Sequence, residues 1–314
     1  MRKVRARPCG HNACFSFTAV LPMPGFLPAP VRGVIAFSLL VINTLFWCAL
    51  LFALSLVKLV LPFAAVRQRV DPVLNAIATS WIACNSGWMR LTQRTAWDVQ
   101  GVDTLAYRGW YLVNCNHQSW VDIFVLQHVM NRRIPMLKFF LKQQLIWVPV
   151  IGLAWWALDF PFMKRGRGHG ARSSDLKTTR EACEKFKRIP TAVMNFVEGT
   201  RFTRAKHHAQ KSPYRHLLKP KVGGLGIALA TMGEQFESML DVTIVYPHGT
   251  PTFWELLSGR LDAVLVRVQP RDIPAEVLGG DPVGDKAYRQ RLTAWIEGLW
   301  AEKDALIERL LGGG

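Results

Sequence analysis

Apolar residues follow two patterns along this chain. Short apolar runs alternate with longer segments in which apolar residues recur every three or four positions. This alternation predicts an α/β fold with a mixed, mostly parallel sheet flanked by helices. The predicted strands are 97–101, 110–114, 157–162, 192–196, 242–246 and 263–268. The predicted helices are 71–92, 120–131, 136–145, 174–188, 223–233 and 285–311.

The longest uncharged stretch lies near the N-terminus. From Gly33 to Val57 there are 25 residues without a charge, and the apolar character resumes from Leu59 to Val66. That length is enough to span a bilayer, but basic residues flank the stretch on both sides, and both flanks would prefer the cytoplasm. We therefore expect a membrane-embedded hairpin of two short helices, since about 14 residues each reach only about 21 Å against a hydrocarbon core of about 30 Å.

These patterns divide the chain into three parts. Residues 1–29 lack periodicity and are expected to form a disordered extension. Residues 30–66 form the expected membrane anchor, either the helical hairpin or a single span. Residues 67–314 are enough for one α/β domain with a sizeable core.

Composition and charge narrow the class of partner. The chain has 50% hydrophobic residues, 12 Trp and a formal net charge of +17. That combination suits an anionic membrane or an acidic substrate. No zinc-finger spacing, RNP-like motif or long basic helix supports nucleic-acid binding. The six cysteines lack C-x2-C spacing and suit a reducing compartment, and the eight histidines show no metal-binding pattern.

The most informative segment is Asn116 to Asp122, which follows an apolar run and contains His117 as well as Asp122. A neutral imidazole takes a proton from an alcohol near pH 7, and a carboxylate on its other nitrogen fixes the tautomer and stabilises the imidazolium. No Ser or Cys lies in a G-x-S-x-G turn, so the sequence favours direct attack by a substrate hydroxyl over a covalent enzyme intermediate. Acyl transfer is the simplest chemistry that this arrangement allows.

The five-residue offset constrains the local structure. On a helix it would turn the two side chains about 140° apart, so we expect His117 in a strand-to-helix turn and Asp122 reaching back from the following helix. Taken alone, H-x4-D also fits a capping histidine beside an exposed aspartate. A second polar cluster, 196–201, follows the apolar run 191–196. Because ligands gather outside the carboxyl ends of strands in open α/β sheets, the two clusters suggest one crevice.

Both clusters resemble motif blocks of the glycerolipid acyltransferases, the family typified by bacterial (PlsC-like) lysophosphatidic acid acyltransferase. The first block, N-H-x4-D, is matched by Asn116, His117 and Asp122. The third block, F-P-E-G-T-R, is matched by residues 196–201, with Val197 in place of the proline.

Two further blocks match more loosely. Residues 160–165 look like the second block, which ends in an arginine, and residues 242–247 look like the fourth, an apolar strand that ends in proline. Together the blocks cover residues 97 to about 270. The run from 139 to 165 looks most similar to the YihG-type branch of bacterial acyltransferases.

The resemblance implies roles for individual residues. His117 is implied as the general base and Asp122 as the residue that orients it, whereas Arg201 is implied to pair with a phosphate. Arg201 is one of seven basic residues between Glu198 and Glu234, an interval that contains no acidic residue. No metal or bound cofactor is implied. The residues expected to bind substrate are Glu198, Gly199, Thr200, Arg201, Arg165 and Lys221.

The function expected from the resemblance is O-acyl transfer at a membrane. The acyl group would come from acyl-CoA or acyl carrier protein as co-substrate and pass to a lysophospholipid acceptor, with 1-acylglycerol 3-phosphate as the first candidate. The expected location is the lipid bilayer of the bacterial inner membrane, with the catalytic domain on the cytoplasmic side. The alternatives are the same chemistry on another lysophospholipid or a lipid A precursor, and a noncatalytic membrane-binding protein.

Overall fold

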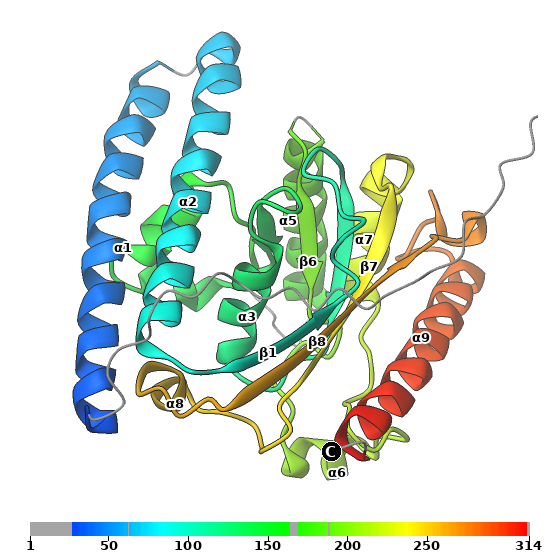
Figure 1. The fold of residues 1–314 in the computed structure, drawn as a ribbon. Coiled ribbons are helices and arrows are strands. Elements are labelled where there is room, and N and C mark those ends of the chain that lie inside the picture. Colours follow the sequence, from blue (N-terminus) through cyan, green and yellow to red (C-terminus); the bar gives the residue numbers. More distant parts are fainter. Residues whose placement is uncertain (1–26, 62, 164–168, 188, 313–314) are drawn as a thin grey trace, which may run out of the picture.

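The computed structural model describes residues 27–61, 63–163, 169–187 and 189–312. The expected disordered extension falls, up to residue 26, outside the described residues. Figure 1 shows a twisted sheet with helices on both faces and a pair of long antiparallel helices along one side.

The sheet has six strands in the order β1-β8-β7-β2-β6-β3. Neighbouring strands are parallel except β7 and β8, which are antiparallel. A separate two-stranded pair joins β4 to β5. The predicted mixed, mostly parallel sheet is therefore confirmed. The strands are β1 (Ala96–Gln100), β2 (Tyr111–Cys115), β3 (Leu137–Phe139), β4 (Leu141–Lys142), β5 (Phe162–Met163), β6 (Ala192–Asn195), β7 (Ser238–Val245) and β8 (Ala263–Arg271).

Helices cover both faces of this sheet, and side chains of each strand alternate between two cores. In β2, Val113 and Cys115 face the core beneath α1 to α4, whereas Leu112 faces the core beneath α5, α7 and α9. The α-helices are α1 (Ala29–Val60), α2 (Ala64–Thr92), α3 (Val121–Met130), α4 (Ile151–Ala157), α5 (His169–Phe186), α6 (Arg204–Gln210), α7 (Gly223–Met232), α8 (Phe253–Leu257) and α9 (Lys286–Gly312). The 3-10 helices are η1 (Gln143–Trp147), η2 (Gly233–Gln235) and η3 (Ala275–Val277).

Two predicted elements were wrong. Residues 136–145 were expected to be a helix, but they form β3, β4 and the start of η1. All three residues of β3 are buried, so the period-two alternation that marks a half-buried strand is absent there. Residues 157–162 were expected to be a strand, yet α4 ends at Ala157 and only Phe162 enters β5. At residues 137–142, pairing of β3 with β6 and of β4 with β5 overrode the local pattern.

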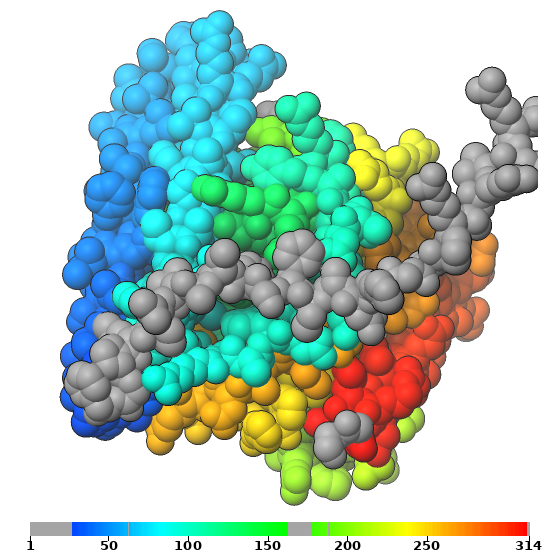
Figure 2. Space-filling model, viewed as in Figure 1, coloured from blue at the N-terminus to red at the C-terminus, as the bar shows by residue number. Residues whose placement is uncertain are grey.

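The N-terminal hairpin also differs from the expectation. Residues Ala29–Val60 form one helix of 32 residues, and α2 runs back beside it. The prediction of two short helices within 30–66 is wrong because no proline lies between Pro30 and Pro62, and the one glycine in that interval, Gly33, is in the first turns of the helix. Among the described residues, α1 alone is long and apolar enough to cross a membrane. Figure 2 shows the pair formed by α1 and α2 as a ridge that projects beyond the rest of the molecule at one end.

A buried ion pair fixes α9 to the centre of the sheet. Lys303 of α9 lies 2.9 Å from the carboxylate of Asp241 in β7, and both side chains are almost fully buried. The ammonium also donates to the carbonyl of Val242, and Asn114 of β2 donates to Asp241. This network links α9, β7 and β2, the strand that leads into the His117 segment.

Candidate active site

The turn after β2 is held in place by Asn116. Its amide nitrogen donates to the carbonyl of Ile244 at 2.8 Å, and its amide oxygen accepts from the N–H of Ile244 at 2.9 Å. The side chain therefore continues the pairing of β2 with β7 past the last backbone pair. Because Asn116 is buried and has both of its polar atoms bonded, the next residue, His117, leaves the sheet from a fixed point.

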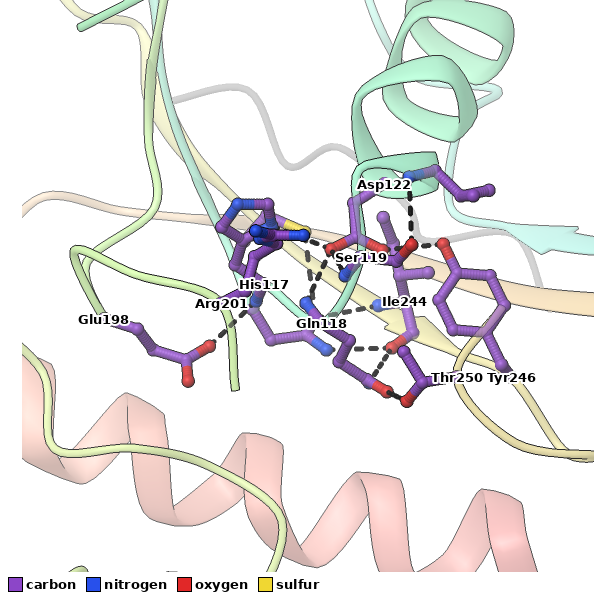
Figure 3. A network of polar contacts seen from close by, with 12 residues as sticks. His117, Gln118, Ser119, Asp122, Glu198, Arg201, Ile244, Tyr246 and Thr250 are labelled. Carbon is purple, nitrogen blue, oxygen red and sulfur yellow. Dashed lines mark hydrogen bonds and ion pairs between the residues drawn. The ribbon is translucent and has the colours of Figure 1, made fainter. Parts of the chain in front are cut away.

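His117 and Asp122 form the expected pair. The distance from His117 Nδ1 to Asp122 Oδ2 is 2.9 Å, and Asp122 is buried. The same carboxylate oxygen accepts from the backbone N–H groups of Gln118 at 2.6 Å and Ser119 at 2.8 Å. His117 thus lies in the turn and Asp122 reaches back from α3, as the spacing predicted. Because Asp122 is buried, the alternative of an exposed aspartate is wrong. Figure 3 shows the contacts around this pair.

The second oxygen of Asp122 is bonded to Tyr246, which the sequence did not single out. Tyr246 directly follows β7, and its phenol hydroxyl donates to Asp122 Oδ1 at a distance of 2.6 Å. Burial, together with the neighbouring Asp122 carboxylate, raises the pKa of Tyr246 well above its usual value, so the phenol keeps its proton as a donor. The one signal in the sequence was its position at the end of the fourth block.

The imidazole of His117 presents one free nitrogen. Because a carboxylate only accepts hydrogen bonds, Nδ1 carries the proton and Nε2 has the lone pair. Phe196 stacks on the ring, with 3.9 Å between the centroids and 16° between the planes. The His117 side chain is 14% exposed, and Nε2 has no hydrogen-bond partner among the described residues. The arrangement suits a base that meets a substrate at Nε2.

Glu198 is buried beside the backbone of His117. One of its oxygens accepts from the backbone N–H of His117 at 2.8 Å and the other from that of Leu218 at 3.0 Å. Glu198 was expected to bind the acceptor, but its side chain is fully buried and has no surface to offer a substrate. It instead ties the segment after β6 to the His117 turn, where Phe202 N also donates to the carbonyl of His117 at 2.7 Å.

The turn after Glu198 brings several predicted residues together. Gly199 has a φ of +68°, which favours glycine. A Cβ at this position would lie 3.3 Å from Cδ of Lys221, so the lysine stem passes directly over the turn. The hydroxyl of Thr200 accepts from the ammonium of Lys206 at 2.8 Å. Lys221 and the E-G-T-R segment are therefore neighbours.

Arg201 is exposed at the end of this turn. Its guanidinium lies 5.0 Å from the ring centroid of Trp120, which precedes α3 and was not predicted as a site residue. Such stacking orients a guanidinium while its N–H groups stay available. Arg201 forms no salt bridge with the residues that the structure describes. Arg165, the remaining candidate, lies outside the described residues.

Metal binding has no candidate site in the described part of the chain, where no group of three or more His, Cys, Asp or Glu side chains is placed to hold an ion. The expectation that the reaction needs no metal or bound cofactor stays a prediction.

Comparison with known proteins shows which enzymes the chain resembles. The acyltransferase family model matches residues 96–249, which include both motif turns. A 1-acyl-sn-glycerol-3-phosphate acyltransferase 2 from Arabidopsis thaliana is 28% identical over 211 residues, which cover 63% of this chain and 51% of that protein. The human 1-acyl-sn-glycerol-3-phosphate acyltransferase delta is 25% identical over 214 residues, with 63% and 52% covered. The family match covers just under half of this chain, and the chain matches about half the length of these curated relatives.

A solved structure has the same fold. The 1-acyl-sn-glycerophosphate acyltransferase PlsC from Thermotoga maritima aligns with a TM-score of 0.50 and 18% sequence identity, covering 89% of this chain and 98% of that chain. The assignment to the YihG-type branch remains a prediction.

The bond from Tyr246 gives a prediction about stability. Tyr246→Phe removes the donor to Asp122 Oδ1 and leaves that buried oxygen without its partner, so the free energy of unfolding should fall by about 1.5–3 kcal/mol. Thermal unfolding of the detergent-solubilised protein measures this loss. Tyr107→Phe, at an exposed tyrosine, is the matched control and should change little. Equal stability of the two variants would contradict the importance of the bond.

Glu198 gives a prediction about pH. Burial raises the pKa of Glu198 to about 8, although the two backbone N–H donors act in the opposite direction. Between its ordinary value near 4.5 and about 8, the folded protein holds a proton that the unfolded chain has lost. Stability should therefore fall as pH rises through this window, by at most about 1.4 kcal/mol per pH unit.

Glu198→Gln is the variant that tests it. Glutamine cannot titrate, so between pH 5 and pH 8 the free energy of unfolding should fall more for the wild type than for the variant. This difference in slope is expected even if the variant is more or less stable than the wild type at every pH. Denaturation midpoints across this range measure the difference. Parallel curves would show that Glu198 does not hold the proton.

Proposed function

We propose that this chain is a membrane-associated O-acyltransferase. It transfers a fatty acyl group from acyl-CoA or acyl carrier protein to the free hydroxyl of a lysophospholipid, with 1-acylglycerol 3-phosphate as the first candidate acceptor. The observation that carries the proposal is the His117–Asp122 pair, in which Nε2 of the partly exposed imidazole has no hydrogen-bond partner among the described residues. The names of the relatives support the choice of acceptor.

The proposed reaction is direct. His117 Nε2 removes the proton from the acceptor hydroxyl as its oxygen attacks the thioester carbonyl carbon. Asp122 holds the imidazole by Nδ1 and stabilises the imidazolium that forms. When the tetrahedral intermediate collapses, the carbon–sulfur bond breaks and the departing thiolate takes the proton from Nε2. The products are an ester and a free thiol, and His117 returns to its starting state.

The acceptor's phosphate is proposed to bind beside this pair. Arg201 is exposed and oriented by Trp120, and Lys221 passes over the same turn. A guanidinium offers two parallel N–H groups to a phosphate, which an ammonium does not. Lys206 donates to Thr200 and to the carbonyl of Arg201 and so stabilises the turn from below.

Membrane attachment is proposed to run along α1. At about 1.5 Å per residue, this helix is about 48 Å long, and it exposes apolar side chains along its length. The domain holds both of its ends: a Cβ on Gly33 would contact Trp254 of α8, and Lys58 pairs with Asp71 and Asp159. A helix flanked by its own domain in this way suits burial in the surface of one leaflet, which keeps both basic flanks on one side.

His117→Ala tests the proposed base. Transfer should fall by about 10² to 10⁴ with folding intact, because a positioned base contributes roughly that factor. The measurement is thiol release from acyl-CoA or acyl carrier protein by the purified protein in the presence of 1-acylglycerol 3-phosphate. The exposed pair His248–Asp262 supplies a matched control, and His248→Ala should keep normal turnover. Near-normal turnover of His117→Ala would rule out the base, and no turnover by the wild type with any lysophospholipid would favour a noncatalytic protein.

Arg201→Lys tests the phosphate contact. The acceptor KM should rise about tenfold, since a point charge does not reproduce the bidentate fork, while the donor KM stays near its original value. Saturation curves for each substrate measure the two constants. Arg204→Lys, three residues further on at the start of α6, is the control and should change neither. A rise confined to the donor KM would place Arg201 on the CoA or carrier-protein side.

A further inference from the structure

The segment from Gln143 to Leu158 has no charged residue, yet much of it lies at the surface. No residue of η1 is buried, and Trp147 at its end is 84% exposed. On α4, Gly152, Ala154 and Ala157 are buried, whereas Leu153 and Trp156 are each more than half exposed. We call the exposed side chains Trp147, Val148, Leu153 and Trp156 the tryptophan patch.

The backbone beneath this patch is held in a strained conformation. Val150 has φ +64° and ψ −60°, and the N–H of Ile151 donates to the carbonyl of Pro149 at 2.7 Å. This is a γ-turn with positive φ at a β-branched residue, a costly and rare arrangement. Gly152 packs so tightly on the carbonyl of Ile146 that a Cβ would come within 2.1 Å of it. The strained turn therefore carries a conformational cost, and burial of Trp147 does not offset that cost, because this side chain is exposed.

The patch is continuous with the apolar surface of α1. The two helices α1 and α4 are in contact. A groove of about 660 Å³ lies between them and α5, and it is lined by Phe52 and Leu56 of α1 and by Leu153 and Trp156 of α4. Leu56 is itself among the exposed apolar residues of α1. The apolar face of α1 and the part of the tryptophan patch on α4, Leu153 and Trp156, thus form one surface.

We propose that the tryptophan patch is a second membrane-binding element, which inserts into the same leaflet as α1. The partner is a phospholipid bilayer, and the inference rests on the membrane attachment proposed above for α1. With α1 as the only contact, the domain can roll about the helix axis. A second contact beside the helix fixes that rotation and so sets the height of the His117 site above the lipid surface.

The chemistry of the patch favours lipid over a protein or nucleic-acid partner. Tryptophan combines a large apolar surface with one N–H donor and is enriched where hydrocarbon meets headgroups. The patch has no charge of its own, and exposed Lys142 precedes it. The groove beside it is lined by three basic residues, Lys58, Arg67 and Lys185, and by two acidic ones, Asp159 and Glu181. An excess of cations at the border of an apolar patch suits the anionic headgroups of a bilayer.

Site-directed fluorescence tests the proposal on the full chain. Cys48, Cys115 and Cys183 are buried, so a background with Cys9, Cys14 and Cys84 changed to Ser accepts a single label. An environment-sensitive dye is placed by Trp147→Cys in the patch, by Leu45→Cys on the exposed face of α1, and by Val283→Cys as the control. Val283 precedes α9, which lies on the far side of the molecule from α1 in Figure 1.

The expected result in vesicles of phosphatidylcholine and phosphatidylglycerol is quenching by brominated acyl chains at positions 147 and 45 and none at 283. Quenching at 45 alone would overturn this inference and leave the attachment through α1 intact. Absence of quenching at both positions would overturn both. Energy transfer between labels at 147 on different copies, without quenching by lipid, would assign the patch to self-association and also overturn the proposal.

A binding measurement completes the test. The double substitution Trp147→Glu and Trp156→Glu should lower the vesicle partition coefficient at least about tenfold, because two large apolar side chains are replaced by carboxylates that anionic lipid repels. Val283→Glu adds a charge on the opposite side and should leave partition unchanged. Activity in detergent micelles, which needs no bilayer, checks that each variant is folded. Unchanged partition of the double variant would contradict the proposal.

Discussion

The buried carboxylate of Asp122 is the interaction on which the site depends. It accepts from the His117 imidazole, from the backbone N–H groups of Gln118 and Ser119, and from the Tyr246 hydroxyl. A buried carboxylate is tolerated only when such donors surround it. The same hydrogen bonds fix the start of α3, the orientation of the imidazole and the position of the end of β7 relative to β2. The local fold and the chemistry of the site therefore both depend on this carboxylate.

The rest of the molecule brings these donors to one point. Asn116 continues the pairing of β2 with β7, and the Lys303–Asp241 pair anchors α9 beneath the same strands. Glu198 connects the segment after β6 to the backbone of His117. Because β6, β2 and β7 are parallel neighbours, their carboxyl ends lie at one edge of the sheet. The partly exposed imidazole of His117 and the exposed Arg201 sit on a buried layer that hydrogen bonds hold together.

The proposed membrane attachment and the proposed catalysis would depend on the same packed domain. The apolar α1 packs on α2, α4 and α8 and therefore belongs to the domain along its whole length. In the proposed reaction, the lysophospholipid acceptor and the acylated product would reside in the bilayer, whereas the acyl donor would arrive from water. An enzyme seated in the surface of one leaflet would reach both, and the proposed contacts of α1 and the tryptophan patch would set the distance between its site and the headgroups.

The sequence by itself determined the α/β class, most of the elements and the His117–Asp122 pair, because hydrophobic period and short-range spacing are local properties. It missed β3, whose buried residues lack alternation. It also predicted two short helices where the chain forms the single helix α1. It also missed the hydrogen bond from Tyr246 to Asp122, the stacking of Phe196 on His117 and the contact of Trp120 with Arg201. It placed Glu198 against substrate, whereas that carboxylate is buried. Those contacts join segments up to 124 positions apart. Only strand order and register decide which distant side chains meet, because no local pattern encodes a contact between separate strands.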